Sequence, residues 1–250
     1  MRRMSIVFNR DLREHRQTGA FLIIVIVFTI ITIIAAVVTN IVLGRQEWLQ
    51  MKTAARPMLE LILGLIAYFL PLSILMTFIW VFSSLPIIKE KVNGNIASLL
   101  ATTLTPKEIW MGKSLAIFLP GFVISVVSTL IVLLLVNLTT IRPVTGNFFL
   151  PVPLLLTSLL VNPLLFLGLL LFIILFSLAK NPDTAITPSF LVGFGLMTGI
   201  PLGVATGKIN LASWSFCLWC LAGTAVFWAV VLFFSRLLTK ENIVLSSKGD

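Results

Sequence analysis

The sequence predicts an all-α integral membrane protein with six transmembrane helices, and three observations lead to this fold class. Only 11% of the 250 residues are charged, whereas a soluble domain carries about 25%. The mean hydropathy is +1.10. Six stretches of 24 to 37 residues contain no charged residue, and each exceeds the roughly 20 apolar residues that cross a bilayer as a helix.

The apolar cores of these stretches predict the spans. They lie near 21–43, 61–83, 114–138, 154–178, 186–206 and 214–235. Outside them lie the tail 1–20, the connection 84–113, the tail 236–250 and shorter loops, none long enough for a further domain of about 50 residues or more. Residues 1–250 are therefore predicted to form one transmembrane domain. The first span carries no small-residue cleavage site after a short core, so we expect a retained helix and not a signal peptide.

The distribution of Lys and Arg predicts the orientation. The two tails, the connection 84–113 and Lys180 hold 13 of the 18 basic residues, and the other three loops hold five. Because basic residues concentrate in cytoplasmic loops, both termini and the connection 84–113 are predicted to be cytoplasmic. The net charge of +9 is explained in this way, and we expect no nucleic-acid partner.

The tail 1–20 has the pattern of an amphipathic helix lying at the membrane surface. Apolar residues form one predicted face, namely Met4, Val7, Phe8 and Leu12. Charged residues are assigned to the other faces, namely Arg10, Asp11, Arg13, Glu14 and Arg16. The alternative is a frayed basic anchor, because a short helix gains its order mainly from the surface on which it lies.

Residues for bond chemistry are scarce in this sequence. The single histidine, His15, lies in the tail, and Glu60 is the acidic residue nearest to a span core. A zinc site or an intramembrane protease needs more ligands or a base beside its nucleophile. Gly112-Lys113-Ser114 resembles the end of a phosphate-binding loop, but Lys107 stands where that motif requires Gly. We therefore expect no enzymatic activity, no metal and no cofactor in this chain.

The fifth predicted span contains a ladder of small residues. Glycines recur at every fourth position, as Gly195, Gly199, Gly203 and Gly207. A helix face without side chains allows another backbone to approach closely. The ladder predicts either tight packing within the chain or a sliding or dimer contact near a transport path.

The connection 84–113 carries the most specific pattern. Ile96, Leu99, Leu100 and Leu104 are spaced as a short apolar face, and Thr105-Pro106-Lys107-Glu108 reads as a helix cap followed by proline at the first helical position. We therefore expect two short cytoplasmic helices joined by a turn. Bulky apolar residues in a loop of 30 residues need a partner to cover them.

In these residues the connection resembles the permease subunits of ABC (ATP-binding cassette) exporters of the second export class. The matching positions are Glu90, Lys91, Gly94, Ile96, Leu99, Leu100, Thr102, Glu108, Ile109, Gly112 and Lys113. The chain departs from the family pattern at Asn95, Ala97 and Thr103. The resemblance also covers the plan of six spans and the amphipathic tail.

The resemblance implies that this loop holds a coupling helix that docks on a separate ATPase subunit. Ile96, Leu99 and Leu100 would enter a groove of the ATPase, and Glu90, Lys91, Glu108 and Lys113 would orient the contact, with Gly94 and Gly112 in the same segment. Two permeases, identical or different, would frame the transport path in the cytoplasmic membrane of a prokaryote. The spans carry no charge, which favours an apolar or amphipathic cargo over a bare ion. The alternatives are a membrane anchor or assembly module without transport, and an ATP-independent carrier or channel.

Overall fold

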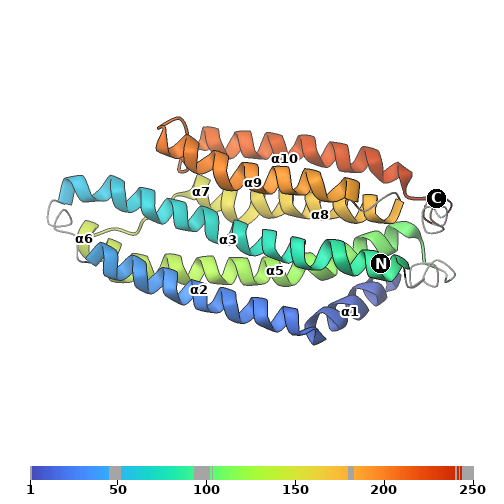
Figure 1. Cartoon of the computed structure of the whole chain (residues 1–250). Helices are drawn as coiled ribbons and strands as arrows, with labels where there is room; N and C mark the ends of the chain where they lie inside the picture. Colours follow the sequence, from blue (N-terminus) through green and yellow to red (C-terminus); the bar gives the residue numbers. More distant parts are fainter. Residues whose placement is uncertain are drawn as a thin grey trace.

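The computed structural model is a bundle of long helices that run alternately in opposite directions (Figure 1). It describes residues 2–44, 52–92, 102, 104–179, 183–239, 241 and 243. The long helices are α1 (Arg2–Gln17), α2 (Gly19–Gly44), α3 (Lys52–Val92), α5 (Pro106–Val136), α8 (Asn162–Ala179), α9 (Asp183–Ala205) and α10 (Trp214–Phe234). Short segments join them: the π-helices η2 (Asn137–Ile141) and η3 (Thr157–Val161), α6 (Arg142–Thr145), α7 (Val152–Leu156) and the 3₁₀ turn η4 (Ser235–Leu237). The described residues contain no strand, so the all-α prediction is confirmed for them.

Five segments of the described chain are long and apolar enough to cross a membrane. They are Gly19–Ile41, Leu61–Ser83, Pro106–Ile141, Val152–Leu178 and Trp214–Phe234. These segments contain or closely match five of the six predicted spans, and they support a multi-pass membrane protein. The remaining predicted span, 186–206, lies in α9, in which the described apolar stretch Phe190–Ala205 is shorter.

Of the two helices predicted in the connection 84–113, the first lies almost entirely outside the described residues, and the second takes a different form. Helix α3 continues past the second span to Val92, and α5 begins at Pro106 and runs into the third span without interruption. The second expected cytoplasmic helix is therefore the first part of α5. A hydropathy pattern identifies the apolar part of a helix, whereas the helix itself extends beyond that part: α3 continues through Pro86 and the charged residues 89–91 to Val92.

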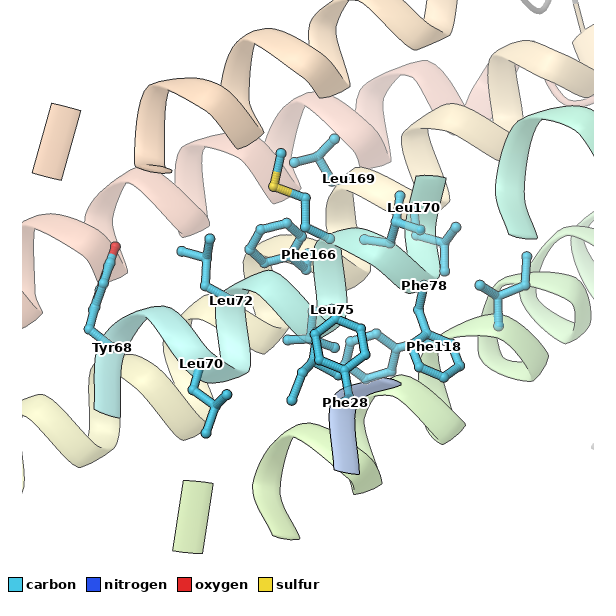
Figure 2. Packing of buried hydrophobic residues seen from close by; sticks show 14 of the residues in the cluster. Phe28, Tyr68, Leu70, Leu72, Leu75, Phe78, Phe118, Phe166, Leu169 and Leu170 are labelled. Carbon is cyan, nitrogen blue, oxygen red and sulfur yellow. The ribbon is translucent and has the colours of Figure 1, made fainter. Parts of the chain in front are cut away.

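Helix α3 forms the centre of the bundle. Of the 18 residues in its apolar stretch, 67% are buried inside the structure, whereas only 22% are buried in the corresponding stretches of α2 and α10. It packs against α5 and α8, while α2 and α10 lie at the outside. The central cluster includes side chains of α2, α3, α5 and α8 (Figure 2), namely Phe28 of α2, Phe78 of α3, Phe118 of α5 and Phe166 of α8. Helices α2 and α10 expose many apolar side chains, as expected of helices that face lipid.

Candidate functional site

The residues predicted to dock an ATPase are only partly described by the structure. Glu90 and Lys91 lie in the last turn of α3. The apolar part of the predicted surface and its glycine, namely Gly94, Ile96, Leu99 and Leu100, lie outside the described residues. Glu108, Gly112 and Lys113 lie in the first turns of α5, within the described residues.

A capping box begins α5. The Thr105 hydroxyl accepts a hydrogen bond from the backbone N–H of Glu108 at 3.3 Å. In return, a Glu108 carboxylate oxygen accepts the backbone N–H of Thr105 at 2.8 Å, and Pro106 occupies the first turn. Two N–H groups that the helix itself leaves unpaired are satisfied in this way. The cap predicted from the sequence is confirmed, and the Glu108 carboxylate has a structural partner within its own helix.

The first turns of α5 are held on two sides. The indole N–H of Trp110 donates to the backbone carbonyl of Leu171 in α8 at 2.7 Å. On another side, α1 lies directly against Gly112. A Cβ at Gly112 would come within 3.0 Å of the Val7 Cβ and 3.2 Å of the Met4 carbonyl oxygen, so a side chain at this position would push α1 away. Glycine permits the close approach of the two helices.

A buried ion pair joins α1 to α5 one residue further along. The Lys113 ammonium lies 3.0 Å from an Asp11 carboxylate oxygen, and the two residues are only 2% and 3% exposed. The Arg10 guanidinium contacts the other oxygen of Asp11 at 3.0 Å, and it reaches Glu14 at 3.6 Å on the solvent side. Charged groups are buried in this way when a partner of opposite charge offsets the loss of water.

We call the contact made by Val7, Asp11, Gly112 and Lys113 the α1–α5 junction. The helix predicted for the tail is present as α1, and its place at a membrane surface stays a prediction. Asp11 was assigned to its charged faces but lies on its buried face. Positions 4, 7 and 11 fall on one side of an α-helix. The position of Asp11 around the helix therefore places it on the face of Met4 and Val7, although its charge suggested a solvent-facing side. Gly112 and Lys113 were predicted as ATPase contacts. In the structure both residues contact α1.

The predicted glycine ladder does not pack against another helix in the described part of the chain. A Cβ at Gly195 or Gly199 would meet no described atom within 4 Å. Gly203 approaches Ile209 of the turn that follows its own helix, and Gly207 adopts a positive φ of 69° within that turn. The close contact of α9 occurs at Gly193, where a Cβ would lie 2.9 Å from the Met76 sulfur. A contact of the ladder with another chain stays a prediction.

The chain matches no protein-family model, and no curated protein or solved structure shows significant similarity to it.

Proposed function

We propose that the chain is the transmembrane permease subunit of an ABC exporter of the second export class. It would have six spans with α9 as the fifth, cytoplasmic termini, and a second permease as its partner in the cytoplasmic membrane of a prokaryote. Helix α1 and the last turn of α10 lie at one end of the bundle (Figure 1), which supports an even number of crossings. ATP hydrolysis would take place in the separate ATPase, which docks on the connection between α3 and α5.

The α1–α5 junction is the observation that carries this proposal. Residues 93–105 lead directly into the capped start of α5, and α5 is fixed there to α1 by the buried Asp11–Lys113 pair and to α8 by Trp110. A partner that moves the connection would therefore act on α5 and α1 together. A loop with no mechanical link to the spans could not couple to transport, so the junction supplies what a coupling loop needs.

Affinity purification of the tagged chain from its own host membranes, followed by mass spectrometry and an ATPase assay, tests the proposal. We expect a stoichiometric ABC ATPase to copurify with the unchanged chain. The double variant Leu99→Asp/Leu100→Asp should lose it. Lys107→Asp is the matched control, because it also places an acidic residue in this region but at an exposed position of α5.

The outcomes separate the alternatives. An ATPase that is retained by Lys107→Asp and lost by the double Asp variant would support the permease. No ATPase in any of several mild detergents would contradict it, and would favour a membrane anchor or an ATP-independent carrier. An ATPase that binds all three proteins equally would contradict the assignment of the docking surface to Leu99 and Leu100.

A further inference from the structure

A cavity of about 380 Å³ lies toward the end of the bundle opposite α1, between the start of α3, α7 and the turn after α9. Its wall is largely apolar and uncharged, and includes Leu61, Gly64, Leu154, Val204, Ile209 and Asn210. The volume falls in the range of small-molecule sites, about 300–1,000 Å³, which typically combine an apolar wall with a few polar groups.

Three buried polar groups lie deeper along the helices that line this cavity. Tyr68 and Ser158 are fully buried and Asn162 is 2% exposed. The Tyr68 hydroxyl, the Ser158 hydroxyl and the Asn162 amide nitrogen have no hydrogen-bond partner in the described structure. The Tyr68 hydroxyl points from α3 toward α10 (Figure 2) and lies near the Asn162 side chain, but the two groups do not meet the distance and angle of a hydrogen bond. Buried polar groups are nearly always paired, so an unpaired cluster requires an explanation.

The helical register connects these groups to the cavity. Tyr68 follows the lining residue Gly64 by four positions, and Ser158 follows the lining residue Leu154 by four. Residues four apart lie on the same face of a helix, about one turn or 6 Å further along its axis. Tyr68 therefore lies on the same face of α3 as the lining residue Gly64, one turn further into the bundle, and Ser158 follows Leu154 in the α7–η3 segment. Each of the three polar groups can pair with a hydroxyl or carbonyl group, and none carries a charge at neutral pH.

We propose that the cavity and this polar cluster form one binding site for an uncharged amphipathic molecule, with an apolar body and a single hydroxyl or amide group. The apolar body would lie against Leu61, Leu154 and Val204, and the polar group would pair with Tyr68, Ser158 or Asn162. A charged group would lose its water here without meeting an opposite charge. The site lies away from the α1–α5 junction, so this inference does not depend on an ATPase partner.

Photolabelling of the full-length chain in lipid nanodiscs tests the site, with a long-chain primary alcohol that carries a diazirine in its chain as the probe. We expect saturable labelling of the peptides that contain residues 61–64 and 204–212, with competition by unlabelled alcohol. Gly64→Phe places a ring in the cavity and should reduce this labelling at least about 10-fold. Gly64→Ala is the matched control, since its Cβ would make an ordinary contact of 3.8 Å with Leu154. Labelling spread evenly over α2 and α10, or unaffected by Gly64→Phe, would overturn the site.

A second variant tests the polar cluster alone. Tyr68→Phe removes only the unpaired hydroxyl, so the fold should be at least as stable without ligand. The Kd of the alcohol should rise about 3- to 10-fold, as expected for the loss of one hydrogen bond, while the Kd of the alkane with the same diazirine should not change. An unchanged alcohol Kd in Tyr68→Phe would overturn the role of the cluster. Tighter binding of the corresponding fatty acid than of the alcohol would overturn the preference for an uncharged ligand.

Discussion

Removal of either charge from the buried pair of the α1–α5 junction should release α1. Asp11→Asn takes the carboxylate away from an ammonium group that is 2% exposed. Breaking a buried ion pair by removal of one partner costs about 3–5 kcal/mol. Lys113→Met leaves Asp11 in contact with Arg10 at 3.0 Å, so we expect a cost of about 1–3 kcal/mol for this variant, the scale of one charge-assisted hydrogen bond.

The double variant Asp11→Asn/Lys113→Met gives the sharper test. Replacement of a whole buried ion pair by uncharged side chains is often close to neutral. The double variant should therefore be more stable at the junction than Asp11→Asn alone. The costs of independent substitutions add within about 0.5 kcal/mol, whereas here the cost of the double variant should fall short of the sum by about 2 kcal/mol or more.

Limited trypsin digestion measures the release of α1, because Arg13 and Arg16 are exposed on this helix and cleavage requires the helix to open. A cost of 3 kcal/mol corresponds to an increase of about 100-fold in the open population, and hence in the cleavage rate, when opening is fast. Glu14→Gln is the control. Glu14 forms only the exposed 3.6 Å contact with Arg10, and such pairs contribute about 0–1 kcal/mol. Equal rates for all variants, or costs that simply add in the double variant, would refute the reasoning.

Three further substitutions test the packing and the cap. Gly112→Ala should weaken the docking of α1 by about 1–3 kcal/mol, the usual cost of overpacking, because its Cβ would lie 3.0 Å from Val7. Trypsin should cleave α1 faster in this variant, whereas Gly223→Ala, with no atom within 4 Å of its Cβ, should leave the rate unchanged. Thr105→Ala should destabilise the start of α5 by about 1 kcal/mol through loss of the cap and should therefore speed hydrogen exchange there. Thr105→Ser keeps the capping hydroxyl and is the control. Gly121→Ala should lower the Tm, because its Cβ would lie 2.9 Å from the Phe78 ring, and an unchanged Tm would contradict that contact.

The membrane-crossing segments were predictable because the bilayer imposes a length and a composition on them. The predicted span 61–83 coincides with the segment Leu61–Ser83. The cap at Thr105 was predictable as well, since its partners lie three residues apart in the sequence. The extension of α3 to Val92 was not, because it contains Pro86, which is usually found at helix ends, and the charged residues 89–91, which end the hydropathy signal.

Contacts that depend on how helices lie against one another could not be predicted. The four-residue spacing of glycines predicted a packing contact at Gly195 and Gly199, yet the close contact of α9 is made by Gly193 with Met76. Which side of an apolar helix faces the bundle depends on its neighbours, and a charge-free span carries little information about it. The unpaired cluster at Tyr68 and Asn162 joins residues 94 positions apart, and a single sequence contains no record of that proximity.

Polar contacts fix α5 at both of its ends, with apolar packing in between. At the end that carries α1, Asp11 binds Lys113. At the other end, the Asn137 amide accepts the backbone N–H of Phe149 at 2.8 Å, and the Asn40 side-chain oxygen accepts the hydroxyl hydrogens of Thr139 and Thr140. The second group of contacts falls in the π-helix η2, where the backbone leaves the regular α-helical register, a feature that is frequent at functional sites. A displacement that begins at the α1–α5 junction can move α5 as one unit, bend it at its internal Pro120, or be absorbed at η2. Motion of α5 as one unit would reach the end of the bundle that holds the cavity, so a change at the connection 93–105 has a physical path to the opposite end of the bundle.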